Sequence, residues 1–294
     1  MPNSERLTAA RRRRRRLRRL RRRPDSRPRF KGQSFNRLIP NILTLIGLCA
    51  GLNGMRMAMD GEFGPAAVAL LIAACIDGLD GRIARLLRAT SRFGAEFDSL
   101  SDFFCFGVAP AFILYAWTLH ETGPYGFLPC MMFAVCMGLR LARFNAGLGA
   151  DEDRPAYAQN FFTGVPAPAG AGLAMFPIFL GLEARHQHLD WLWRVAHNPG
   201  LVALVLIGVA FLLVSTLPIW SFKNFKVPAA YVLPVLLGIS AYVAVLVADP
   251  WAALAAAGLI YLVTIPFSRR SYHSLRRDAD LLIEDAPEEP EPAG

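Results

Sequence analysis

The stretch D-G-L-D-G-R-I-A-R-L-L-R-A-T-S-R-F-G-A-E-F-D-S-L-S-D, from Asp77 to Asp102, places four aspartates in strongly apolar surroundings. A carboxylate at the centre of a membrane helix costs about 2.5 to 3.5 kcal/mol, so such a group requires a cation, a wet cavity or both. Helical spacing puts the aspartates on two faces. These faces are Asp77, Asp80 and Ala84 on a first helix, and Gly94, Asp98 and Asp102 on a second. The sequence therefore predicts two acidic helix faces that meet across one gap.

The composition indicates a membrane protein. The chain has 294 residues, of which 54% are hydrophobic and only 19% are charged, and its mean hydropathy is +0.33. A spanning helix needs about 20 mostly apolar residues, and eight such windows occur along the chain. They lie at residues 36–59, 63–88, 95–119, 124–145, 161–183, 199–220, 228–247 and 250–267. We therefore expect an all-α, polytopic membrane helical bundle of about eight transmembrane helices.

A membrane domain and two tails are expected. Residues 1–34 hold a dense run of arginines that repel one another, which predicts a disordered basic cytoplasmic tail. Residues 35–268 form the predicted membrane domain, and residues 269–294 a cytoplasmic tail with a disordered acidic end. Each basic residue near an anionic surface contributes about 1 kcal/mol, so the arginine tail is expected to bind anionic membrane lipids. Nucleic acid is not an expected partner, because no recognition module accompanies the charge.

The distribution of basic residues predicts the orientation of the chain. Connections near residues 82–92, 140–154, 223–226 and 269–277 carry Lys and Arg, and they alternate with connections that are poor in both. With eight spans, the positive-inside rule places all these basic connections and both termini in the cytoplasm. The four aspartates then lie just below the cytoplasmic headgroups, where a cavity open to the cytosol would hydrate them.

Two further sets of residues contain side chains that can bind metals. The connection near Arg185 to Asn198 is rich in His and Trp, which indicates either a metal site or an interfacial aromatic belt, and the belt is the more common of the two. The five cysteines lack paired spacing, so neither a disulfide framework nor a zinc site is expected.

The aspartates favour a hard divalent cation. Carboxylate oxygens without His or Cys beside them favour Mg²⁺ or Mn²⁺ over zinc, and paired carboxylates suit a two-metal clamp on a phosphoryl group. Gly81 and Gly94 remove side chains at the same gap, which either permits close helix packing or leaves room for a bulky ligand such as a nucleotide. Arg85, at the mouth of the gap, pairs either with a phosphate or with an aspartate.

The residues at this gap match a known pattern, D-x-x-D-G-x-x-A-R-x8-G-x3-D-x3-D, at every fixed position. The chain thereby resembles the CDP-alcohol phosphatidyltransferases. Within that family, three segments look like bacterial phosphatidylserine synthases. They are R-L-A-R-F-N at 140–145, F-F-T-G-V-P-A-P-A at 161–169 and S-T-L-P-I-W-S-F-K at 215–223. The resemblance covers most of residues 36–268 and leaves out both tails.

The resemblance implies a reaction and its setting. An alcohol attacks the lipid-bearing phosphorus of CDP-diacylglycerol, with Mg²⁺ or Mn²⁺ in a two-metal site, and CMP leaves. The three segments favour L-serine as acceptor, and choline, inositol phosphate or glycerol phosphate is the alternative. The resemblance also implies a homodimer in the bacterial inner membrane, with a cytoplasmic active site.

The resemblance also implies roles for individual residues. The metal ligands are Asp77, Asp80, Asp98 and Asp102, of which Asp98 and Asp102 are also the catalytic residues. Either Asp102 is the base for the serine hydroxyl, or a metal-bound water relays this proton, because metal coordination lowers the proton affinity of a carboxylate. The residues expected along CDP-diacylglycerol are Asp77, Gly81, Ala84, Arg85 and Gly94. Arg140, Arg143 and Asn145 either bind the acceptor carboxylate or a phosphate, or simply anchor the cytoplasmic end of their helix.

Overall fold

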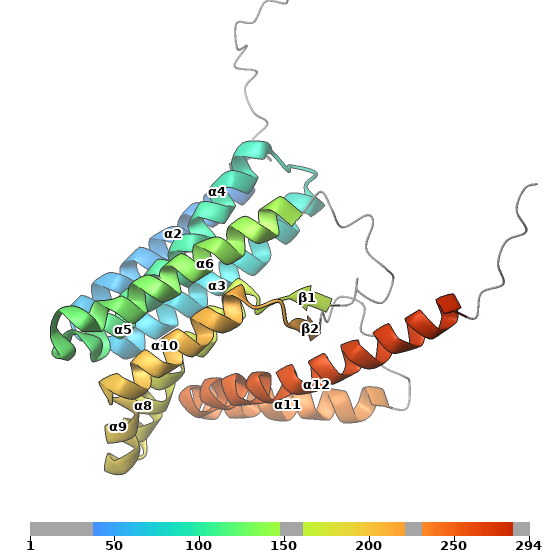
Figure 1. The fold of residues 1–294 in the computed structure, drawn as a ribbon. Helices are drawn as coiled ribbons and strands as arrows, with labels where there is room; N and C mark the ends of the chain where they lie inside the picture. The colour runs from blue at the N-terminus through green and yellow to red at the C-terminus, as the bar shows by residue number, and fades with distance from the viewer. Residues whose placement is uncertain (1–37, 148–160, 221–230, 285–294) are drawn as a thin grey trace, which may run out of the picture.

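A computed structural model describes residues 38–147, 161–220 and 231–284 of the chain (Figure 1). The predicted basic tail, residues 1–34, lies outside the described residues. The first part forms α2 (Leu38–Met59), α3 (Phe63–Leu86), α4 (Arg92–Asp102), η2 (Phe103–Val108), α5 (Ala109–Trp117), η3 (Leu119–Gly126) and α6 (Phe127–Gly147). The second part forms β1 (Phe161–Thr163), α7 (Ala167–Ala174), α8 (Phe176–His186), α9 (Asp190–Ala196), α10 (Pro199–Val214) and β2 (Pro218–Trp220). The third part is a pair of helices, α11 (Val232–Ala248) and α12 (Pro250–Glu284).

The described helices confirm an all-α, polytopic membrane protein. Five helical segments are long and apolar enough to cross a bilayer, and counting each of two bent pairs as one span raises the number to seven. The bent pairs are α7 with α8, at 43°, and α9 with α10, at 51°. The remaining expected window, residues 228–247, corresponds to α11, an apolar helix of 17 residues. The two bends follow from the prolines that open α8 and α10, because proline removes a backbone donor from the preceding turn.

The third span changes its helical pitch directly after Asp102. The segment η2 is a π-helix, and the amide of Ala109 donates to the carbonyl of Phe104, five residues back. Pro110 follows at once and has no amide proton to donate to the preceding turn. Widening the helix over η2 accommodates this proline without breaking the span, and π-helical turns often occur at functional sites.

Two of the expected helical windows include a short strand: residues 161–183 begin with β1, and residues 199–220 end with β2. Residues 161–163 and 218–220 pair antiparallel, with Phe161 opposite Trp220 and Thr163 opposite Pro218. Gly164 explains why the first window is not helical from its start: its φ is +78°, and a Cβ there would lie 2.7 Å from the carbonyl oxygen of Ser215. Helix α7 therefore begins only after Pro166.

The core lies where α5, α6, α7, α8 and α10 meet. Its largest fully buried side chains include Ile113, Leu114, Phe133, Ile178 and Leu206. Helices α2 to α6 run side by side, and the α11–α12 pair lies beside this bundle at an angle to it (Figure 1). None of the residues of α11 is buried. An apolar helix with this exposure is what lipid contact requires.

The C-terminal tail differs from the expectation. Residues 269–294 were expected to form a tail with a disordered end, but α12 continues as a helix to Glu284. The reason is local: no glycine or proline interrupts residues 267–286, and Leu, Arg, Ala and Glu in this stretch favour the helix. The acidic residues from 285 onward lie outside the described part of the chain.

Candidate active site

Three of the four aspartates converge. Asp77 lies on α3, and Asp98 and Asp102 lie on α4; one carboxylate oxygen of each is within 4.8 Å of those of the other two. A short connection, residues 87–91, reverses the chain between the two helices. The hydroxyl of Ser91 accepts a hydrogen bond from the amide of Gly94 at 3.0 Å and so caps α4. This turn is what brings the two acidic faces together.

The cluster has the character of a cation site. All three carboxylates are half-buried, and Oδ1 of Asp98 is enclosed without a hydrogen-bond partner among the described residues. An enclosed charged oxygen without a partner is costly, and three carboxylates at this separation repel one another. A hard divalent cation would relieve both penalties, so the donor set fits the metal expected from the sequence.

Asp80 is held differently from the other three. Only 3% of it is exposed, and its Oδ2 accepts a hydrogen bond of 2.7 Å from the hydroxyl of Thr44 on α2. It does not belong to the group of converging oxygens, although sequence reasoning placed it among the metal ligands. The reason is its position on the helix: it is turned toward α2, where Thr44 is available.

A small cavity borders the cluster on the side of α2. Asp77, Asp80 and Asp102 contribute to its wall. The other lining residues are Thr44, Gly47, Ala73, Ile76, Ser101, Cys105 and Phe106. The lining therefore combines carboxylates with apolar side chains.

The two glycines at the gap differ in their surroundings. A Cβ on Gly94 would lie 2.8 Å from Oδ1 of Asn41, so Gly94 permits close packing of α4 against α2. A Cβ on Gly81 would meet no atom within 4 Å, so the space beside Gly81 is open to a ligand. Of the two alternatives that the sequence left open, close helix packing therefore applies to Gly94, and room for a ligand applies to Gly81.

Two neighbours of Gly81 on α3 were also expected along the substrate. Ala84 is half-buried, and Arg85 is exposed close to the end of α3. Within the described ranges, no ion pair joins Arg85 to an aspartate. The structure therefore leaves this guanidinium available to an anionic ligand.

The basic residues of α6 bind backbone carbonyls. Nε of Arg140 donates to the carbonyl of Val165 at 2.9 Å, and Arg140 also interacts electrostatically with Asp102. Arg143 donates to the carbonyl of Val214 at 2.9 Å, which caps the C-terminus of α10. Asn145 donates to the hydroxyl of Ser99 at 3.0 Å and so joins α6 to α4.

These contacts bring three distant sequence segments together. Arg140 and Arg143 come from residues 140–145, Val165 from residues 161–169, and β2 from residues 215–223. They are the three segments in which the chain resembles bacterial phosphatidylserine synthases. Through Arg140, this region also interacts electrostatically with Asp102 of the aspartate cluster.

Comparison with known proteins agrees with this geometry. A family model described as CDP-alcohol phosphatidyltransferase matches residues 37–206, and one described as CDP-alcohol phosphatidyltransferase 2 matches residues 230–266. The chain belongs to the CDP-alcohol phosphatidyltransferase family. It is therefore a CDP-alcohol phosphatidyltransferase by descent, and the aspartate motif on α3 and α4 lies within the matched residues.

Several curated relatives are similar over much of the chain. The CDP-diacylglycerol–serine O-phosphatidyltransferase of Mycobacterium leprae is 38% identical over 83% of this chain and 78% of its own length. The protein of the same name from Helicobacter pylori is 34% identical over 64% of this chain and 74% of its own. The archaetidylserine synthase of Methanothermobacter thermautotrophicus is 33% identical over 45% of this chain and 54% of its own.

Sequence reasoning missed two residues of this phosphatidyltransferase site. Thr44 binds Asp80, and Asn41 packs against Gly94. Both lie on α2, three residues apart and therefore on one helix face. The sequence did indicate them, because Asn41 and Thr44 are polar residues in the apolar stretch L-I-P-N-I-L-T-L-I-G, residues 38–47. Polar side chains in a membrane helix need a partner.

Proposed function

We propose that this enzyme transfers the phosphatidyl group of CDP-diacylglycerol to the hydroxyl of L-serine, forming phosphatidylserine and releasing CMP. The observation that carries the reaction is the convergence of Asp77, Asp98 and Asp102 at one end of an apolar helical bundle. The names of the relatives support serine as the acceptor, since they include serine phosphatidyltransferases and an archaetidylserine synthase.

The proposed cofactor is Mg²⁺ or Mn²⁺. Asp77, Asp98 and Asp102 would hold it, with Asp80 beside them as a further ligand on the side of α2. When bound, such a cation neutralises the charge of the pyrophosphate and stabilises the charge that develops during the transfer. The proposed site binds two such ions.

The rest of the site orients CDP-diacylglycerol. The open space beside Gly81 and the half-buried Ala84 would accept the cytidine diphosphate, and Arg85 would pair with its phosphates. Gly94 acts indirectly, because it sets the distance between α4 and α2. The acyl chains would remain in lipid, so the headgroup alone has to enter the bundle.

The chain supplies a base and an acceptor site. The hydroxyl oxygen of serine attacks the lipid-bearing phosphorus, the bond from this phosphorus to the CMP oxygen breaks, and the hydroxyl proton passes to Asp102 at the cavity wall. Arg140 would bind the serine carboxylate, since it interacts with Asp102 and a guanidinium matches a carboxylate in shape. Arg143 and Asn145 would hold this region in place through Val214 and Ser99.

The proposal includes the setting of the enzyme. We place it in the bacterial inner membrane, with eight spans, both termini and the aspartate cluster on the cytoplasmic side. The arginine tail would then lie against anionic lipids of the inner leaflet. A homodimer is part of the same proposal.

The decisive assay measures CMP release. Purified protein is mixed with CDP-diacylglycerol, Mg²⁺ or Mn²⁺, and L-serine, glycerol 3-phosphate, inositol phosphate or choline in turn. We expect CMP release with serine, no turnover after chelation, and loss of turnover in Asp98→Asn while the protein stays in the membrane. Faster turnover with another alcohol would overturn the assignment of serine, and an active Asp98→Asn would overturn the site.

A further inference from the structure

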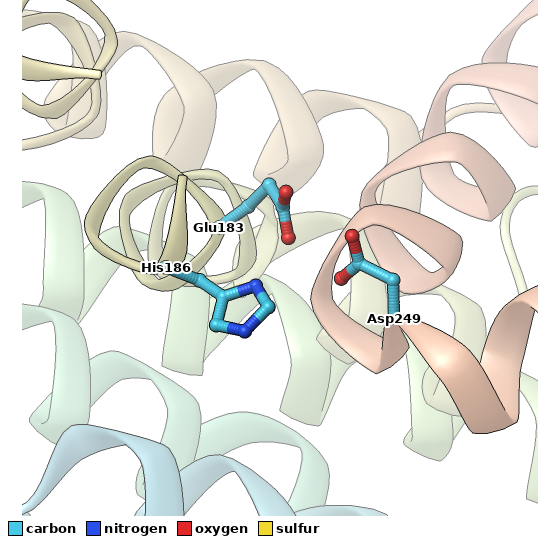
Figure 2. Close-up of side chains that lie close together, drawn as sticks. All are labelled: Glu183, His186 and Asp249. Atoms are coloured by element: carbon cyan, nitrogen blue, oxygen red, sulfur yellow. The ribbon is translucent and has the colours of Figure 1, made fainter. Parts of the chain in front are cut away.

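A second group of metal-binding side chains lies away from the aspartate cluster. Glu183 and His186 lie on α8, and Asp249 lies between α11 and α12; one ligand atom of each is within 4.8 Å of the other two (Figure 2). Glu183 and His186 are three residues apart, so they share a helix face. Figure 2 shows the two carboxylates and the imidazole ring directed toward a common space.

The two carboxylates of this group interact with each other, and each also interacts electrostatically with His186. Oε2 of Glu183 is enclosed and accepts no hydrogen bond within the described residues. No Lys or Arg of the described ranges forms an ion pair with Glu183 or Asp249. The polar side chain that reaches Asp249 is the amide of Gln187, at 3.5 Å from Oδ2. Two carboxylates facing each other without a cation repel, unless they share a proton or bind a metal.

Asp249 is oriented before any ligand arrives. Its Oδ1 accepts a hydrogen bond of 3.3 Å from the amide of Ala252, so it caps the N-terminus of α12. This leaves Oδ2 on the side of α8. Close by, the rings of Phe179 and Trp251 stack at 6.4 Å and hold α8 and the start of α12 together. The ligands are therefore placed by elements that are packed independently of the metal.

We propose that Glu183, His186 and Asp249 form a binding site for a divalent transition metal, and zinc is the metal that this ligand set fits best. An imidazole with two carboxylates matches the donors that zinc accepts, and three protein ligands leave one position for water. The metal would cross-link α8 to the α11–α12 pair, because its ligands come from both. A metal at this position would stabilise the packing of the helix pair, because α11 itself has no buried residues.

This site is separate from the chemistry. A Cβ on Gly64, at the start of α3, would lie 3.8 Å from Leu182 on α8 and from Trp251 on α12. Asp77 lies 13 residues further along α3, which corresponds to about 20 Å at 1.5 Å per residue. The proposed site and the aspartate cluster therefore lie toward opposite ends of one membrane helix. Metal bound at the first does not reach a substrate bound at the second.

The test measures zinc bound to the full chain in detergent, without turnover. Asp98→Asn serves as the background, so that the aspartate cluster contributes little. We expect one zinc per chain in this background, and a rise in melting temperature on adding zinc. Adding Asp249→Asn or His186→Gln should weaken zinc binding at least ~100-fold, because even outer-shell changes cost about 10- to 100-fold. Glu183→Gln, which removes only the charge, provides a further variant if one of these fails to fold.

The matched control is His188→Asn. His188 is in the same connection but outside the group, and its φ is +56°, which asparagine tolerates. This variant should bind zinc as the background does. Zinc affinity that is unchanged by Asp249→Asn, His186→Gln and Glu183→Gln would overturn the proposal. So would a background protein that binds no zinc, since Glu183 and Asp249 would then share a proton instead.

Discussion

At the scale of single residues, the site depends on where each aspartate finds its partner. Asp98 has an enclosed oxygen without a partner, whereas Asp80 receives a hydrogen bond from Thr44. The first arrangement fits an oxygen that a cation would satisfy, and the second fits a ligand that the protein orients before the cation binds. Four aspartates that look equivalent in the sequence therefore have two different environments.

Thr44 provides a test of this distinction. In Thr44→Val, the buried Asp80 loses its donor, and we expect kcat for CMP release to fall by about 10- to 100-fold, since a hydrogen bond to a charged group contributes about 1.5 to 3 kcal/mol. Thr44→Ser keeps the hydroxyl and should retain most activity. Wild-type kcat in Thr44→Val would show that Asp80 does not need this donor.

The two glycines of the motif allow a paired test. Gly94→Ala places a methyl group 2.8 Å from Oδ1 of Asn41, so we expect a loss of about 1 to 3 kcal/mol in stability and a lower melting temperature. Gly81→Ala meets no protein atom within 4 Å, so its melting temperature should be retained while KM for CDP-diacylglycerol rises. An unchanged KM in Gly81→Ala would mean that the substrate does not use this space.

At the scale of elements, the helices were predictable and their irregularities were not. Apolar windows located the spans, because each requires about 20 apolar residues. The π-helix after Asp102 and the strand pair β1–β2 depend on Pro110 and on the positive φ of Gly164, which break periodicity locally. The contact of Thr44 with Asp80 joins residues 36 positions apart, which spacing within one helix cannot reveal.

The connection rich in His and Trp illustrates the same limit. His197 and Trp193 stack on each other at 4.9 Å and pack around Trp117, as an aromatic cluster does. His186 instead joins Glu183 and Asp249. Asp249 follows α11, far along the chain, so no inspection of residues 185–198 alone could identify this group.

The contact of α6 with the segments around β1 and β2 leads to a prediction about the acceptor. Arg140→Ala should raise KM for serine more than KM for CDP-diacylglycerol, because Arg140 is within electrostatic reach of Asp102 and a guanidinium pairs with a carboxylate. Arg143→Ala is the matched control: it removes a cap from α10, so it should lower the melting temperature without a selective effect on serine. Equal changes in both KM values for Arg140→Ala would indicate a structural role only.

At the scale of the whole molecule, the proposed orientation places the two ends of α3 on opposite sides of the membrane. We expect a cysteine at Thr90, introduced into a cysteine-free variant, to react with a membrane-impermeant maleimide only in inside-out vesicles. A cysteine at His188 should react only in intact spheroplasts. Both positions are exposed. Labelling of both from the same side would contradict the orientation derived from the positive-inside rule.

The central claim is that carboxylates from α3 and α4 together hold the catalytic cation. The most direct test is electron paramagnetic resonance of Mn²⁺ added to the purified protein with CDP-diacylglycerol. We predict a bound-Mn²⁺ signal in the wild type that is lost in both Asp77→Asn and Asp98→Asn, one from each helix, and retained in Asp249→Asn. Mn²⁺ binding that is equal in the wild type and in the Asp77 and Asp98 variants would contradict the account.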